Sequence, residues 1–260
     1  MNRTALITGT TSGIGAAFCN LLAKEKYNLI LVARDANALS KQAEALREET
    51  QVNIFCYDLS DAKAPKRIFE DISAAGLSVD ILINNAGFNE AGYFTDTNLD
   101  KELEMVQVHI ETLTELTKLF LPGMIERGYG RILNMGSTGS YMPCPCDAVY
   151  AATKAYVLSF SNGLYQELKG SGVTVTCLCP GATQTRFAEK AHINNTLLFK
   201  IGVMQPEVVA KIGYKNMMRG KRTVAAGLYN KLLVLSAKLL PGAIINPIAQ
   251  WMVKSPSIRG

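Results

Sequence analysis

Short apolar runs recur along the first 180 residues, and each is followed by a stretch whose apolar positions have helical spacing. The pattern predicts strands near residues 4–8, 28–33, 53–58, 79–84, 131–136 and 173–179. Runs such as 28–33 are apolar at successive positions, which is typical of strands covered on both faces. Strands that alternate with helices predict an α/β fold with a doubly wound parallel sheet flanked by helices.

Length and composition favour one soluble domain over residues 1–260. The chain is 48% hydrophobic and 19% charged, and no linker or repeat divides it. The predicted first strand starts almost at the N-terminus, which leaves no room for a signal peptide and favours a cytoplasmic location. Residues 226–260 are rich in leucine and isoleucine and are expected to form a helical C-terminal extension. Two lysines and two prolines interrupt the part from Leu228 to Val253, so it lacks the roughly 18 consecutive apolar residues of a membrane span.

A glycine-rich turn follows the first predicted strand and opens the first helix. Gly9 lets the chain turn sharply, Gly13 allows close approach of a pyrophosphate, and Gly15 allows the helix to pack closely on the sheet. The helix N-terminus then faces the phosphate charge. The spacing Gly-x-x-x-Gly-x-Gly differs from the common dinucleotide pattern, so an ordinary tight turn is an alternative interpretation.

Tyr150 and Lys154 are separated by one helical turn, which places a phenol and an ammonium on the same helix face. A free tyrosine has a pKa of about 10, and a nearby cation favours the phenolate and lowers that pKa. The pair is therefore a candidate for proton transfer. The alternative is an ordinary half-buried aromatic residue beside a surface charge.

These features occur with three others in an order that resembles the short-chain dehydrogenase/reductase family, in particular its ketone and 3-oxoacyl reductases. The motifs that carry the resemblance are Thr8 to Gly15, Asn84-Asn85-Ala86-Gly87, Ser137, Tyr150 with Lys154, and Pro180-Gly181 with Thr185. The resemblance implies a Rossmann-like domain that transfers a hydride between a nicotinamide and a carbonyl or secondary alcohol. It also implies a homodimer or homotetramer.

The resemblance assigns catalytic roles to four residues. Tyr150 is expected to protonate the substrate oxygen, Ser137 to hydrogen-bond the same oxygen, and Lys154 to lower the tyrosine pKa and hold the nicotinamide ribose. The family has asparagine in a proton relay where this chain has His109. Histidine can also donate and accept, so a relay with altered pH dependence is one expectation and a plain core histidine is the other.

Cofactor-binding residues follow from the same motifs. They are Gly9, Thr11, Ser12, Gly13, Ile14, Gly15, Arg34, Asp58, Leu59, Asn85, Ala86, Gly87, Tyr150, Lys154, Pro180, Gly181, Thr183 and Thr185. Asp58 and Leu59 are expected beside the adenine, and Thr185 at the carboxamide. NAD sites place a carboxylate at the end of the second strand, whereas Arg34 stands there and suits a 2′-phosphate. Asp35 is placed to cap the next helix, so NADP(H) is favoured.

Six cysteines are expected to be reduced thiols. Cys177 and Cys179 alternate on one strand and predict two small core side chains on the same face. Together with Cys144 and Cys146 they could form a metal site, but the usual zinc spacing of Cys-x-x-Cys is absent, so no metal is expected.

Charge is unevenly distributed. Residues 1–185 hold 15 Lys and Arg against 20 Asp and Glu, whereas residues 186–260 hold 12 against 2. Basic residues recur every four positions at Lys211, Lys215 and Arg219, which indicates either a solvated helix face or a surface for an anionic partner. Candidate partners are an acyl carrier, coenzyme A or a lipid surface, and no nucleic acid is expected.

The substrate itself is not specified by any motif. Residues 186–225 are expected to form a lid, with the part from Phe187 to Met204 over the pocket, and to have no chemical signature beyond amphipathicity. Two alternative functions are a dinucleotide-binding regulatory protein with weakened catalysis, suggested by His109, and a reductase of lipid-like ketones at a membrane surface.

Overall fold

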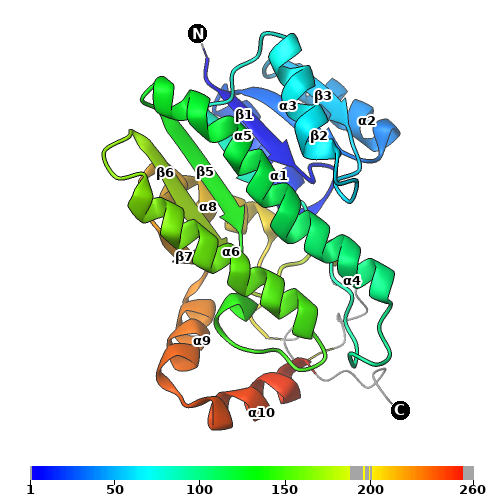
Figure 1. Cartoon of the computed structure of the whole chain (residues 1–260), viewed down its shortest axis with the longest axis vertical. Coiled ribbons are helices and arrows are strands. Elements are labelled where there is room, and N and C mark those ends of the chain that lie inside the picture. The colour runs from blue at the N-terminus through cyan, green and yellow to red at the C-terminus, as the bar shows by residue number, and fades with distance from the viewer. Residues whose placement is uncertain (1, 188–195, 197–198, 200, 254–260) are drawn as a thin grey trace.

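A parallel sheet of seven strands forms the centre of the molecule in the computed structural model, which describes residues 2–187, 196, 199 and 201–253 (Figure 1). The strand order is β3-β2-β1-β4-β5-β6-β7. The strands are β1 Thr4–Thr8, β2 Asn28–Ala33, β3 Val52–Cys56, β4 Ile81–Asn84, β5 Gly130–Met135, β6 Val173–Cys179 and β7 Thr223–Ala225. The order reverses between β1 and β4, as the doubly wound fold requires.

Helices cover both faces of this sheet. In Figure 1, α5 and α6 lie in front of the sheet, and α1 and α8 lie behind it. The α-helices are α1 Gly13–Lys24, α2 Ala36–Leu46, α3 Ala64–Ala74, α4 Leu99–Val106, α5 Leu113–Glu126, α6 Ala148–Glu167, α8 Pro206–Met218, α9 Leu228–Leu239 and α10 Gly242–Val253. A π-helical segment η1, Gln107–Thr112, joins α4 to α5, and a 3₁₀ turn η2, Thr138–Tyr141, follows β5.

Two hydrophobic cores hold the three layers together. Successive residues of a strand point to opposite faces, so Ile7 packs with the α1 and α8 layer while Leu6 packs with the α3 and α5 layer. Both side chains are fully buried. Burial of one such side chain contributes about 1.5–3 kcal/mol, which explains why apolar runs mark the strands so clearly.

The predicted fold class is confirmed, and strands 4–8, 28–33 and 173–179 have the predicted bounds. The other three predicted strands are displaced by one or two residues. No apolar run predicts β7, which has three residues and is defined by its pairing with β6 from Cys177 to Cys179. Residues 206–225 of the expected lid form α8 and β7, which extend the sheet and pack against α1. Part of the remainder, at 188–195, 197–198 and 200, lies outside the described residues.

The C-terminal extension is helical through Val253, and its residues 254–260 lie outside the described part. Asn230 of α9 is 2% exposed, and its Nδ2 donates to the Ala226 carbonyl at 2.6 Å. A Cβ on Gly181 would lie 2.1 Å from Asn230 Oδ1, so α9 packs directly on the loop that follows β6. Both C-terminal helices therefore project from the end of the sheet where the strands finish (Figure 1).

Candidate active site

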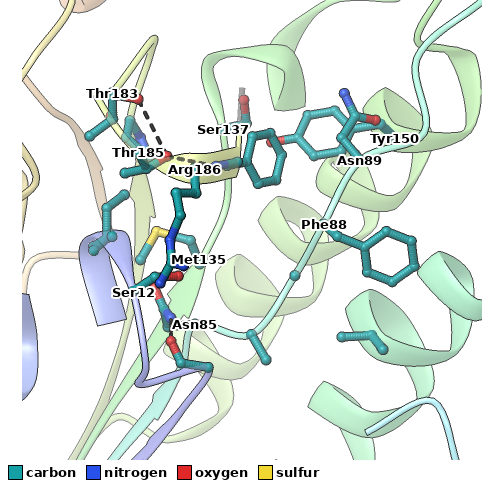
Figure 2. Close-up of a pocket in the computed structure, with 18 of the residues that line it drawn as sticks. Ser12, Asn85, Phe88, Asn89, Met135, Ser137, Tyr150, Thr183, Thr185 and Arg186 are labelled. Carbon is teal, nitrogen blue, oxygen red and sulfur yellow. Dashed lines mark hydrogen bonds between the residues drawn. The ribbon is translucent and has the colours of Figure 1, made fainter. Parts of the chain in front are cut away.

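A cavity of about 350 Å³ opens at the carboxyl ends of β1, β4, β5 and β6, which is where the doubly wound fold binds ligands. Apart from Gly15, it is lined by every residue that the sequence predicts to bind cofactor, and by Ser137. Figure 2 shows Ser12 and Asn85 on one side of this cavity and Ser137, Asn89 and Tyr150 on another. The predicted cofactor-binding residues and the predicted catalytic residues therefore line one cavity.

The glycine turn has the geometry that its sequence predicts. Gly9 and Gly13 have φ of +68° and +56°, which glycine adopts without strain. A Cβ on Gly15 would lie 2.1 Å from the Gly9 carbonyl oxygen, so any side chain there would force the turn and α1 apart. Gly15 thus shapes the site from behind the cavity.

Polar contacts fix this turn to β4. Asn85 Nδ2 donates to the carbonyl oxygens of Thr8 at 2.9 Å and Gly9 at 3.1 Å. The backbone N–H groups of Asn85 and Ala86 both donate to Thr8 Oγ1 at 3.0 Å. Asn85 was predicted as a cofactor contact, and the structure adds a second role in which its side chain fixes the turn.

Tyr150, Lys154 and Ser137 converge on the opposite wall. Tyr150 and Lys154 lie in the first two turns of α6, and Lys154 Nζ is 5.6 Å from the centre of the Tyr150 ring. Lys154 Nζ also donates to the Met135 carbonyl at 3.0 Å, which fixes the ammonium behind the tyrosine. The Ser137 hydroxyl accepts from the Gly139 N–H at 3.1 Å at the start of η2. The three residues have the arrangement expected of a proton donor, a stabilising cation and an oxygen-binding hydroxyl.

Burial dominates the electrostatics of this wall. It lowers the pKa of Lys154 to about 8, although Cys177 and Cys179 behind the lysine oppose the shift. Burial also raises the pKa of Tyr150, while a hydrogen bond from Ser137 lowers it. The sequence predicted a lowered tyrosine pKa because of Lys154, but removal of the phenol from water has the larger effect here. A neutral phenol is the form that donates a proton.

His109 lies in η1, fully buried beside Tyr150, with the two ring centres 5.8 Å apart. Its Nε2 accepts from the Phe88 N–H at 3.3 Å, which leaves Nδ1 to donate to Thr153 Oγ1 at 2.9 Å. Thr153 in turn donates to the Tyr150 carbonyl at 2.8 Å. Burial and the Lys154 charge hold the pKa of His109 well below its usual value. The contacts therefore hold a neutral imidazole between the Phe88 backbone and the first turn of α6.

Arg34 lies at the end of β2 on the cavity wall, and its Nη1 is 3.8 Å from Asp58 Oδ2. Both side chains are exposed, so this pair contributes under about 1 kcal/mol and leaves the guanidinium free to bind another anion. Partial burial acts to raise the pKa of Asp58, but hydrogen bonds from Ser60 and the Arg34 charge outweigh it and the net shift is downward. Asp35 caps α2, since its Oδ1 accepts from the Ala38 N–H at 3.0 Å.

Residues after β6 form a further wall of the cavity. Thr183 Oγ1 donates to the Gly181 carbonyl at 3.1 Å, and Thr185 Oγ1 accepts from the Phe187 N–H at 3.3 Å. Arg186, Phe187 and Phe199 also line the cavity, and they belong to the segment 186–225 that is expected to form a lid. Three further lining residues, Phe88, Asn89 and Asp147, are not marked by any feature of the sequence. They lie in loops outside the family motifs, and only the tertiary structure places them at the cavity.

Cys177 and Cys179 lie side by side on β6 as predicted, with their Sγ atoms 3.7 Å apart in a buried cluster. Burial raises the pKa of Cys144 to about 12, which keeps that thiol protonated. In the described part of the chain, no group of three or more histidine, cysteine or acidic side chains could hold a metal ion.

Comparisons with known proteins agree with this geometry. The family model for short chain dehydrogenase matches residues 3–195, and the chain belongs to this family of oxidoreductases. It is 31% identical over 254 residues to a human very-long-chain 3-oxoacyl-CoA reductase, covering 95% of this chain and 76% of that protein. It is 36% identical over 189 residues to sulfoacetaldehyde reductase 2 of Chromohalobacter salexigens, covering 72% and 75%.

Solved structures show the same fold. A short-chain dehydrogenase from Sphingobium yanoikuyae in complex with NADPH superposes with a TM-score of 0.80 at 30% identity, covering 91% of this chain and 93% of that one. The bulky-bulky ketone specific alcohol dehydrogenase of Comamonas testosteroni gives 0.77 at 30% identity, with the same coverage.

The site fits a nicotinamide dinucleotide. The glycine turn leaves backbone N–H groups and the N-terminus of α1 facing the cavity, which suits a pyrophosphate. When bound, the cofactor supplies or accepts the hydride in interconversion of a carbonyl and an alcohol. In the reductive direction, the roles expected from the family resemblance would have Ser137 hydrogen-bond the substrate oxygen and Tyr150 donate a proton to it. Lys154 would then stabilise the negative charge that develops on the phenol oxygen.

Proposed function

We propose that this enzyme is an NADPH-dependent reductase of 3-oxoacyl thioesters or related ketones. The observation that carries the cofactor choice is Arg34, which stands at the end of β2 where an NAD site would hold a carboxylate. The nearby carboxylate of Asp35 is occupied as the cap of α2. A guanidinium at this position is complementary to a 2′-phosphate.

The substrate class is supported by the walls of the cavity beside Tyr150. Phe187 packs against Tyr150 with ring centres 5.9 Å apart, and Phe88 and Phe199 also line the cavity. An apolar wall of this kind suits the acyl chain of a substrate. The names of the human relative and of the ketone-specific alcohol dehydrogenase structure are consistent with this substrate class. Retention of Ser137, Tyr150 and Lys154 in one wall argues against a regulatory protein with weakened catalysis.

Arg34→Asp should narrow or reverse the preference for NADPH over NADH. A charge-assisted contact to phosphate contributes about 1.5–3 kcal/mol, so discrimination in the unmodified enzyme should be about tenfold to a hundredfold. The measurement is kcat/KM for each cofactor with acetoacetyl-CoA as substrate. Arg47→Asp, at the far end of α2, is the matched control and should keep the original preference. Equal use of both cofactors by the unmodified enzyme would refute the Arg34 assignment.

The basic stripe of Lys211, Lys215 and Arg219 is exposed on α8 and at its C-terminal cap. Helix α8 begins next to the cofactor turn, because Pro206 and Glu207 lie beside Ser12. It then runs antiparallel to the strands and carries the stripe away from the cavity. This placement favours the solvated-face interpretation over recruitment of an acyl carrier to the pocket.

The C-terminal helices support a second candidate property, association with a lipid surface. They expose an apolar face, here called the C-terminal face, made by Leu228, Leu232, Leu235, Leu239, Ile244, Ile248 and Trp251. Two of these side chains, Leu228 and Leu239, are more than 70% exposed. Lys231 and Lys238 are the charged residues between Leu228 and Val253, so the helices are cationic without a carboxylate. Apolar side chains together with cationic charge suit an anionic membrane surface.

No helix in the described residues is both long enough and apolar enough to cross a bilayer. We infer that the C-terminal face lies in the lipid interface, which would bring the nearby cavity mouth to the membrane and give a long acyl chain a direct route to it. The two helices lie at the same end of the sheet as the site (Figure 1).

The protein should co-sediment with vesicles that contain phosphatidylcholine and phosphatidylglycerol, and binding should weaken as salt increases. Leu232→Asn with Leu239→Asn should reduce the partition coefficient about tenfold or more, because each leucine loses its apolar burial. Ile125→Asn with Val208→Asn replaces two exposed apolar side chains on α5 and α8, outside the C-terminal face, and is the control. Equal binding by both double variants, or no binding by the unmodified protein, would contradict the proposal.

A further inference from the structure

Two polar side chains lie at the substrate end of the cavity and have no part in the chemistry described above. Asn89 follows β4 and Asp147 immediately precedes α6, and both line the cavity. Asn89 is only 6% exposed. Figure 2 shows it at the same end of the cavity as Tyr150, the expected proton donor. The pair is therefore close to the place where the carbonyl must bind.

Neither side chain has its hydrogen bonds satisfied. Both amide atoms of Asn89 and the Oδ1 of Asp147 are buried and lack a partner of hydrogen-bond geometry. Asp147 is the N-cap residue of α6 but makes no side-chain cap hydrogen bond. A buried polar group left unpaired destabilises the folded protein, and such groups in native proteins commonly have a functional explanation.

The two side chains also influence each other. Burial raises the pKa of Asp147 to about 7, and the amide of Asn89 opposes this shift. The amide is thus near the carboxyl group even though the contact is not a well-formed hydrogen bond. A ligand with its own hydrogen-bond donor and acceptor would satisfy the open hydrogen bonds of both side chains.

The backbone holds the pair in place. The Gly92 N–H donates to the Cys146 carbonyl at 2.8 Å, which ties the Asn89 loop to the Asp147 loop. On the other side of Asn89, the Phe88 N–H is fixed by His109. Both loops are therefore anchored before substrate binds, and a preorganised site loses little binding energy to ordering.

The surrounding walls define what this pair could bind. Phe88, Phe187 and Phe199 are apolar, so a hydrogen-bonding group of the substrate at this end of the cavity is best placed against Asn89 and Asp147. Asn89 offers an N–H donor and a carbonyl acceptor, and Asp147 offers a carboxylate acceptor. A secondary amide carries one donor and one acceptor and matches this set.

We propose that Asn89 and Asp147 form a specificity subsite for the secondary amide on the thioester arm of the substrate. The substrate N–H donates to the Asp147 carboxylate, and the substrate C=O accepts from Asn89 Nδ2. This inference rests on the proposed thioester reductase function and identifies which end of the cavity holds the thioester arm. It also predicts discrimination against thioesters without the amide, since such substrates leave the hydrogen bonds of Asn89 and Asp147 unsatisfied.

The test compares two thioesters that differ only in the arm, S-acetoacetyl-N-acetylcysteamine and S-pentyl 3-oxobutanethioate. The unmodified enzyme should favour the amide-bearing substrate by about tenfold or more in kcat/KM, as expected from one unsatisfied buried polar group. Asn89→Leu should bring this ratio close to one, and Asp147→Asn should reduce it. Asn216→Leu removes the same side chain from α8, where its Nδ2 bonds to the Ile212 carbonyl, and should leave the ratio unchanged.

Because both substrates are measured on the same enzyme, a general loss of folded protein cancels in the ratio. Equal kcat/KM for the two thioesters in the unmodified enzyme, or an unchanged ratio in Asn89→Leu, would overturn the subsite and leave the reductase function intact. Failure of the unmodified enzyme to reduce either thioester would instead refute the proposed function.

Discussion

Replacement of Tyr150 by phenylalanine should lower kcat by about two to four orders of magnitude and leave cofactor binding nearly intact. The substitution removes only the phenol oxygen, and the ring keeps its contacts with His109 and Phe187. The proton that completes carbonyl reduction then has no donor at the correct position. The size of the loss is typical of general acid catalysis.

Turnover should be measured with acetoacetyl-CoA, and cofactor binding by the fluorescence of bound NADPH. Tyr156→Phe is the matched control, because Tyr156 lies on the same helix and its hydroxyl bonds to Thr114 away from the cavity. Turnover close to that of the unmodified enzyme in Tyr150→Phe would show that another group donates the proton.

Lys154→Met should also reduce turnover by two orders of magnitude or more, and it should make the protein more stable at neutral pH. Burial lowers the pKa of this lysine from 10.5 to about 8. At pH 7 the charged form is thus less favourable in the folded than in the unfolded state, by about 3 kcal/mol at 1.36 kcal/mol per pH unit. Methionine of similar length removes this penalty, although the hydrogen bond to the Met135 carbonyl is lost with it.

The sign of the pH dependence follows from these values. Between pH 8 and 10.5 the unfolded lysine binds more protons than the folded one, so its contribution to stability rises with pH. The stability advantage of Lys154→Met should therefore be constant below pH 8 and shrink as the pH approaches 10.5. Denaturant unfolding of both proteins across this range measures the difference, and Lys41→Met, an exposed lysine on α2, controls for removal of a charge. A difference that stays constant over the whole range would contradict a buried lysine with a lowered pKa.

Together these experiments separate the roles of two residues on the same wall of the cavity. In the proposed mechanism Tyr150 acts on the substrate oxygen, whereas Lys154 acts on the tyrosine and carries a cost in stability. A charged group held at a cost in folding free energy is typical of a catalytic site and would be unusual for a purely structural residue.

Sequence alone was sufficient for the fold class, because it depends on local patterns. Buried parallel strands need continuous apolar runs, and the runs at 28–33 and 173–179 became β2 and β6 with unchanged bounds. The glycine turn could also be predicted from local sequence. Few residues other than glycine tolerate the positive φ of Gly9 and Gly13 or the lack of space at Gly15. The Tyr150 and Lys154 pair followed from helical periodicity.

Tertiary structure decided the features that depend on residues far apart in the chain. β7 exists because β6 offers it a free edge, and three residues are too few to give a strand pattern of their own. The contacts of His109 with Phe88 and Thr153 also join residues far apart in the chain, and the sequence contains no sign of them.

The substrate end of the cavity shows the same limit. Asn89 and Asp147 are separated by more than 50 residues and lie in loops without a motif, so their proximity comes from the packing of β4 and α6 around one cavity. Local sequence determines which elements form and which chemistry they can carry. Long-range packing determines which side chains are withdrawn from water together, and that decides the pKa of Lys154 and the hydrogen bonds left open to a substrate.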